Sequence, residues 1–167
     1  MALPQTISEK DTYSATFEQE YQTTLKVLRA YPPAKSELKP SERSMSAREL
    51  AWTLTLNQMV VEPILQGELM PTGLPPAPAT WAEVLAAFEN AHKNASAKIS
   101  KLTDEAMNGT VHTIVGPKQE GNLRTGVMLW MMVSDTIHHR GQLSVYLRMA
   151  GGKVPSIYGP SGDEPWM

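Results

Sequence analysis

Apolar side chains recur at intervals of three and four positions in four long stretches of the chain, and proline or glycine separates these stretches. Such spacing puts the apolar side chains on one face of an α-helix, so the pattern predicts helices over residues 10–31, 46–66, 80–102 and 123–150. Pro63 lies inside the second stretch. Because proline has no amide hydrogen to donate, we expect that helix to kink or end there.

Two short motifs mark where the second and third helices begin. Ser46 and Glu49, and likewise Thr80 and Glu83, are spaced as in a capping box, in which each side chain bonds the backbone amide of the other residue. The segment 111–115 is rich in β-branched residues, which favour extended backbone. We therefore expect one short extended excursion between the third and fourth helices.

These elements predict an all-α fold: a single domain over residues 1–167, built as a four-helix bundle. The connection from Met70 to Ala79 holds four prolines and a glycine, and it is long enough to cross over the bundle between the second and third helices. Residues 151–167 hold three prolines together with Ile157, Tyr158 and Trp166. This composition predicts an ordered arm that lies on the bundle.

Composition narrows the classes of function. Hydrophobic residues make up 41% of the chain and the formal net charge is -2, so the chain lacks the basic surface that nucleic-acid binding requires. The absence of cysteine excludes disulfides, thiolate nucleophiles and cysteine metal sites. The longest apolar run, residues 127–133, is far shorter than the roughly 20 residues that span a bilayer, and the first residues do not resemble a signal peptide. We expect a cytoplasmic protein that binds neither membranes nor nucleic acid.

The start of the fourth predicted helix is apolar on every side, over Val127 to Val133. A helix that buries one face only should also carry a polar face. This turn is therefore expected to pack both on the bundle core and on a second subunit, which makes a homodimer the simplest arrangement. The alternative is that the long loops and the C-terminal arm cover its outer side.

Candidate chemistry follows directly after this apolar turn. Asp135 and His139 are four residues apart and so lie one helical turn apart on one face, and His138 lies almost as close to Asp135. Carboxylate oxygens and imidazole nitrogens bind first-row metals, but the same two groups also form ordinary internal ion pairs. A third ligand must come from another helix. His92 is expected on a solvated face and His112 in the extended excursion, so neither is an obvious third ligand.

The run from His138 to Arg148 (HHRGQLSVYLR) resembles the helix-four signature of the DinB/YfiT-like superfamily. The segment Ser46–Thr53 resembles the family's helix-two region, and residues 151–160 resemble the tail of a bacterial subgroup. The resemblance implies a four-helix bundle with a crossover connection, often a homodimer. It also implies a divalent metal, commonly zinc or nickel, held by one histidine of helix two and two histidines of helix four.

Carried onto this chain, the three ligand positions are Thr53, Asp135 and His139. His139 keeps the family ligand, Asp135 is a carboxylate substitute, and Thr53 supplies only a weakly donating hydroxyl. Water, Glu49 or Asn57 could complete such a site.

His138 could also replace one of the missing nitrogens. The resemblance implies a metal-dependent transferase or hydrolase that activates a thiol or water for a small-molecule substrate. The alternative is a degenerate, non-catalytic dimer of helical bundles. In that case Asp135 and His139 form a structural ion pair or a small-ligand site.

Overall fold

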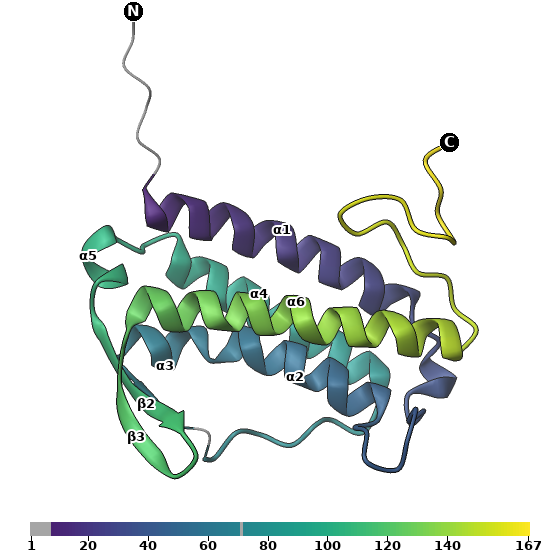
Figure 1. Ribbon diagram of the computed structural model, residues 1–167, viewed down its shortest axis with the longest axis horizontal. Helices are drawn as coiled ribbons and strands as arrows, with labels where there is room; N and C mark the ends of the chain where they lie inside the picture. Colours follow the sequence, from purple (N-terminus) through teal and green to yellow (C-terminus); the bar gives the residue numbers. More distant parts are fainter. Residues whose placement is uncertain (1–7, 71) are drawn as a thin grey trace, which may run out of the picture.

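The computed structural model describes residues 8–70 and 72–167, and in this part of the chain four long helices pack side by side (Figure 1). The long helices are α1 (Glu9–Ala30), α2 (Ala47–Met59), α4 (Trp81–Ile99) and α6 (Thr125–Met149). The short elements are η1 (Pro33–Lys35), α3 (Val61–Leu65), α5 (Asp104–Met107), β1 (Glu68–Leu69), β2 (Thr110–Gly116) and β3 (Gln119–Arg124). The predicted bundle is present, and each long helix lies within a few residues of its predicted range.

The predicted helix starts are confirmed by the hydrogen bonds at their first turns. Ser46 Oγ accepts from the Glu49 amide at 3.2 Å, and the Ser46 amide donates to Glu49 Oε2 at 2.7 Å. Thr80 and Glu83 form the same reciprocal pair at the start of α4. The second predicted helix is divided into α2 and α3 at Val60, three residues before Pro63. Proline is tolerated in the first turn of α3 because the amides there have no partner within the helix.

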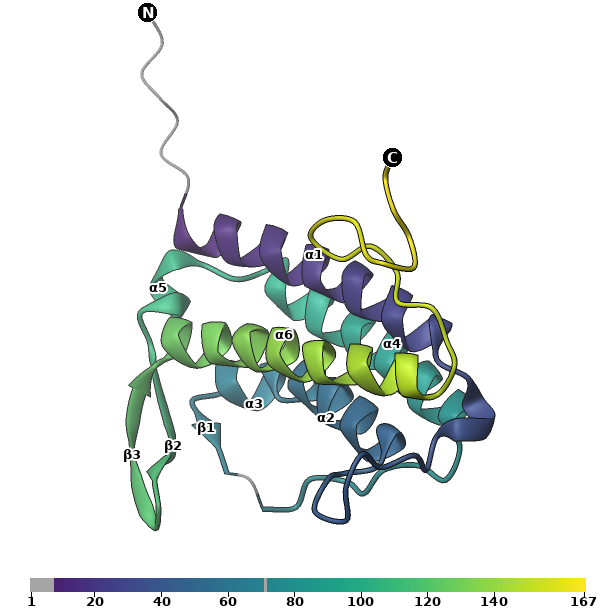
Figure 2. The ribbon, with the colours of Figure 1, turned by 45° about the vertical axis from the view of Figure 1, so that its right-hand side comes forward.

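The connection from α3 to α4 crosses the bundle lengthwise, as Figures 1 and 2 show. It returns to the end at which α2 begins, so α2 and α4 run in the same direction, whereas α6 runs opposite to α2. Two side chains of α2 hold this connection: Trp52 Nε1 donates to the Pro75 carbonyl at 2.8 Å, and Arg48 Nη1 donates to the Pro78 carbonyl at 2.7 Å. The predicted crossover is therefore confirmed.

A small sheet shows that the all-α prediction was too narrow. In the described residues β1, β2 and β3 are adjacent in that order, with β1 parallel and β3 antiparallel to β2. Val111 and Thr113 face the bundle and are buried, whereas Ile114 and Val115 are exposed. The strand β3 uses residues up to Arg124, so the last helix begins at Thr125 and not at residue 123. The strands are short, and they are stabilised by pairing within the sheet together with burial of Val111 against the bundle.

The core has two apolar clusters with a polar layer between them. One cluster includes Leu50, Phe88 and Leu143, and the other includes Ile64 and Leu129. Between the two clusters, every long helix contributes buried polar side chains at the same level of the bundle. These residues are Glu20 and Thr24 of α1, Asn57 and Gln58 of α2, His92 of α4, and Thr136 and Arg140 of α6.

Residues 151–167 are held against the C-terminal halves of α1 and α6 by side-chain contacts. Val154 is buried in one apolar cluster, and its amide donates to Asp163 Oδ2 at 3.0 Å. The same carboxylate accepts from Arg148 Nε of α6 at 2.9 Å. Tyr158 places its hydroxyl on the polar layer. No described helix is long and apolar enough to cross a membrane.

Candidate functional site in the polar layer

A buried ion pair lies at the centre of the polar layer. Arg140 Nη1 of α6 donates to Glu20 Oε2 of α1 at 2.5 Å, and the two side chains are 1% and 7% exposed. Arg140 Nη1 also contacts Thr24 Oγ1 at 3.2 Å. The Tyr158 hydroxyl closes the outer side, because it contacts Arg140 Nη2 at 2.5 Å and donates to Glu20 Oε2 at 2.8 Å. Burial of these charges is tolerated because each has several close polar partners.

Asp135 and His139 lie at the other edge of the layer, between α2 and α6. His139 Nδ1 lies 3.0 Å from Asp135 Oδ2 and 3.0 Å from the Asp135 carbonyl oxygen. The side chains are 37% exposed for Asp135 and 17% exposed for His139, so the pair can be reached from solvent. The structure thus brings these two predicted site residues together.

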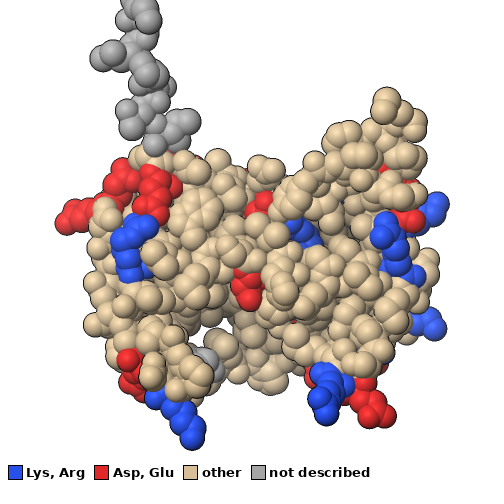
Figure 3. Space-filling model, in the orientation of Figure 1, with Lys and Arg blue, Asp and Glu red and all other residues tan. Residues whose placement is uncertain are grey.

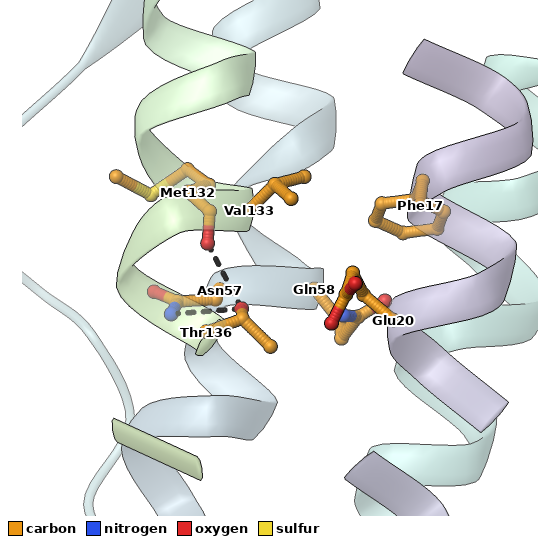
Figure 4. A pocket seen from close by; sticks show the side chains of 7 residues that line it. All are labelled: Phe17, Glu20, Asn57, Gln58, Met132, Val133 and Thr136. Carbon is orange, nitrogen blue, oxygen red and sulfur yellow. Dashed lines mark hydrogen bonds between the residues drawn. The ribbon is translucent and has the colours of Figure 1, made fainter. Parts of the chain in front are cut away.

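Asn57 connects this outer pair to the interior of the bundle. Its Nδ2 donates to Asp135 Oδ2 at 2.8 Å and to Thr136 Oγ1 at 3.2 Å. Figure 4 shows Asn57 of α2 bonded to Thr136, whose own hydroxyl donates to the Met132 carbonyl of α6. The Asp135 carboxylate has no hydrogen to donate, and the Thr136 hydroxyl has already donated its hydrogen to Met132. Both groups therefore require a donor, so the amide nitrogen of Asn57, not its oxygen, faces them.

A small cavity of about 10 Å³ lies behind Asn57, inside the bundle (Figure 4). Glu20 of α1 and Gln58 of α2 line it together with Asn57 and Thr136. This volume is close to the smallest that accommodates one water molecule. The cavity is surrounded by polar groups of three helices, among them Glu20 of the buried ion pair and Asn57, which contacts Asp135.

His92 belongs to the same layer, and the expectation that it lies on a solvated face was wrong. It is 7% exposed and stacks on Tyr21 with ring centroids 3.4 Å apart. Its Nδ1 lies 3.2 Å from Gln58 Oε1, and its Nε2 lies 2.9 Å from Glu18 Oε2. Burial lowers the pKa of His92 below its ordinary value, and the Glu18 carboxylate opposes this shift only in part. In the sequence His92 stands among the polar residues Asn90, Lys93 and Asn94, and these neighbours led to the expectation of a solvated face.

The two other predicted site residues have local partners elsewhere. His138 is exposed on the outer side of α6, where its Nε2 lies 2.9 Å from Gln142 Nε2. The Thr53 hydroxyl donates to the Glu49 carbonyl within its own helix, at 3.3 Å. It is Asn57, one turn beyond Thr53, that contacts Asp135 across the α2–α6 interface.

The donor set does not fit the three-histidine metal centre that the family resemblance implied. Catalytic zinc sites take three protein ligands, whereas this edge of the layer offers one imidazole and one carboxylate. Among the described residues no group of three or more histidine, aspartate or glutamate side chains could hold a metal ion. Asn57 turns its amide nitrogen, not its oxygen, toward Asp135. Asp135 Oδ2 therefore already accepts from Asn57 Nδ2 and lies 3.0 Å from His139 Nδ1.

The pairing of Glu20 with Arg140 was not predicted from the sequence. A signal was present for both, because Glu20 lies three residues after Phe17 on the apolar face of α1, and Arg140 lies three residues before Leu143 on α6. A charge at an inward-facing position needs a partner. The pattern does not say that these two residues, 120 positions apart, are each other's partner.

Sequence and structure comparisons agree on the class of protein. A sequence profile of the DinB family matches residues 6–166, so the chain belongs to the DinB family. The fold is similar to a DinB-like protein of Bacillus subtilis, with a TM-score of 0.68 and 21% identity over 84% of this chain and 92% of that one. A DinB-like protein of Bacillus cereus has a TM-score of 0.67 and 19% identity, covering 87% and 95% of the two chains.

Two further proteins match this chain without assigning it an activity. YfiT of Bacillus subtilis, described as a probable metal-dependent hydrolase with an unusual four-helix bundle topology, has a TM-score of 0.55 and 17% identity over 89% of this chain and 93% of its own. At such identity the similarity shows the fold alone. The uncharacterized protein YrdA of Bacillus subtilis is 46% identical over 39 residues. That match spans 23% of each chain, so it carries no activity to this protein.

Proposed function

We propose that this DinB-family protein uses the Asp135–His139 pair as a proton acceptor that activates water, or the thiol of a small substrate, for hydrolysis or group transfer. The observation that supports this proposal is the 3.0 Å contact between His139 Nδ1 and Asp135 Oδ2 in a pair that solvent can reach. A carboxylate that holds one ring nitrogen of a histidine leaves the other nitrogen free to take a proton.

The hydrogen bonds define the tautomer of His139. Its Nδ1 is hydrogen-bonded to the Asp135 carbonyl oxygen and lies 3.0 Å from the Asp135 carboxylate, and neither oxygen can donate, so Nδ1 carries the hydrogen. The lone pair of the neutral ring is then on Nε2, to which no described residue is hydrogen-bonded. In ester hydrolysis Nε2 would take a proton from water while the hydroxide attacks the carbonyl carbon, and it would return that proton to the oxygen of the leaving alcohol as the ester C–O bond breaks. Asp135 would stabilise the imidazolium that forms.

The proposal needs no bound metal, and this distinguishes it from the chemistry expected from the family resemblance. A protein purified without a polyhistidine tag and dialysed against a chelator should still release p-nitrophenolate from p-nitrophenyl butyrate. Replacing His139 by Gln should lower kcat/KM by about 10²–10⁴-fold, the usual contribution of a general base. Asp135→Asn should lower it as well, because the ring then loses its orienting partner.

His138→Gln is the matched control. It removes the neighbouring histidine on the exposed side of α6 and should leave the rate of ester hydrolysis unchanged. Equal rates for His139→Gln and the wild type would refute the proposed role. A rate that disappears with chelation and returns with zinc would instead support a metal-dependent activity.

We also propose that a second copy of the chain covers the outer face of α6. Four apolar side chains lie on one stripe of this helix, and each is between 40% and 59% exposed: Val127, Met131, Val145 and Met149. Figure 3 shows few charged side chains over the middle of this face, whereas charges gather toward its ends. Light scattering at several concentrations should give twice the mass of one chain, and Met131→Glu should shift the protein to a monomer.

A further inference from the structure

A second space lies directly beside the polar layer: an apolar pocket of about 270 Å³ between α2, α6 and the sheet. Its walls include Leu56 and Val60, Met128 and Met132 of α6, and Ile114 of β2. Figure 3 shows the surface hollowed below α6, beside the β2–β3 hairpin. The volume is slightly below the 300–1,000 Å³ typical of pockets for drug-sized ligands, so the occupant should be small.

Three polar side chains reach this pocket, and each has already donated its hydrogens elsewhere. The Thr53 hydroxyl donates to the Glu49 carbonyl at 3.3 Å, and the Thr113 hydroxyl donates to the Leu69 carbonyl at 2.8 Å. Both hydrogens of the Asn57 amide are bonded within the polar layer, as described above. What these side chains still offer to a ligand is therefore oxygen lone pairs.

Asn57 Oδ1 is the strongest of these acceptors. The Asp135 carboxylate and the Thr136 hydroxyl fix the amide nitrogen on the layer side, and no described group donates to Oδ1. The negative charge of Asp135 lies 2.8 Å from the same amide nitrogen. The pocket therefore offers only hydrogen-bond acceptors, and the Asp135 carboxylate lies next to one of them. Such a site attracts a cation that donates hydrogen bonds and repels an anion.

We propose that this pocket binds a small apolar amine. The hydrocarbon part lies among the leucine, valine and methionine side chains, and the ammonium group donates to Asn57 Oδ1 in the field of Asp135. The amine site rests on the proposed function, because that proposal makes this end of the α2–α6 interface the functional site. It adds the chemical class of the molecule that occupies the space next to the Asp135–His139 pair.

The test compares three probes with one six-carbon chain: hexylamine, 1-hexanol and hexanoate. Each is titrated into the full-length, isotope-labelled protein, and binding is followed by amide chemical shifts. Hexylamine should bind about tenfold or more tightly than hexanoate, because like charges at close range are strongly unfavourable. Asp135→Asn should reduce this ratio. Asp11→Asn is the matched control: it removes one negative charge from an exposed position of α1 and should leave the ratio of the hexylamine and hexanoate affinities unchanged.

Ile114→Trp tests the location of binding. Ile114 is a partly exposed residue at the rim, so a larger ring there should fill the pocket without disturbing the core, and it should abolish binding of both hexylamine and 1-hexanol. Equal affinity for hexanoate and hexylamine would overturn the proposal, as would full binding to the Ile114→Trp variant. Absence of binding by all three probes would overturn it too. His139→Gln should bind hexylamine normally, so a failure of the ester assay and a failure of the titration are distinguishable.

Discussion

Breaking the buried ion pair between Glu20 and Arg140 should lower the free energy of unfolding by a large amount that mutation can measure. Replacing Glu20 by Gln keeps the size of the side chain but leaves the Arg140 guanidinium without its carboxylate. The two side chains are only 7% and 1% exposed, so water cannot replace the lost partner. Removing one member of such a buried pair costs about 3–5 kcal/mol. For a chain of this length that lowers Tm by about 6–20 °C.

Urea unfolding followed by circular dichroism measures this loss as a change in the free energy of unfolding. Glu89→Gln is the matched control, because Glu89 forms a 2.7 Å pair with Arg29 but both side chains are well exposed, at 40% and 60%. An exposed pair of this kind contributes about 1 kcal/mol or less. A loss for Glu20→Gln no greater than that of the control would refute the reasoning from burial.

A double variant separates the charge effect from packing. Changing both Glu20 and Arg140 to Met replaces the buried charges by apolar side chains of similar length, and such replacements are often neutral or stabilising. We expect the double variant to recover a large part of the stability lost in Glu20→Gln. If the double variant is less stable than Glu20→Gln, the contacts of Arg140 with Thr24 and Tyr158 contribute more than its pairing with Glu20.

Three further predictions follow from the structure. Burial lowers the pKa of His92 below its ordinary value near 6.5, so the unfolded chain binds the proton more readily and the free energy of unfolding should fall as pH drops below 6.5. His92→Gln should flatten this dependence in urea titrations, whereas His138→Gln should not, and equal slopes for wild type and His92→Gln would contradict the argument. Ser46→Ala removes the first-turn cap of α2 and should cost about 1 kcal/mol of unfolding free energy; no change would show that the cap is not needed. Replacing both Thr53 and Asp135 by His restores the family's donor set, and zinc at 100 times its dissociation constant should then stabilise the variant by about 2.7 kcal/mol, whereas zinc should not stabilise the wild type.

The sequence alone determined most of the local structure. Periodic apolar positions located the four long helices, the capping boxes at Ser46 and Thr80 located two helix starts, and Pro63 located the break between α2 and α3. The spacing of Asp135 and His139 also predicted their contact. These features depend on residues within one turn of each other, so the chain encodes them without reference to the rest of the fold.

Only the tertiary structure decided which helix faces meet and which polar groups become partners. Asn57 and Asp135 are 78 residues apart, and Glu20 and Arg140 are 120 apart. A helical pattern tells which side chains share a face, but the rotation of each helix about its axis sets what that face contacts. The sheet has the same origin, since β1 is two residues long and pairs with residues of β2 that are distant in the sequence. Long-range pairing of this kind is decided by packing of the whole chain, because no local signal fixes the register between distant segments.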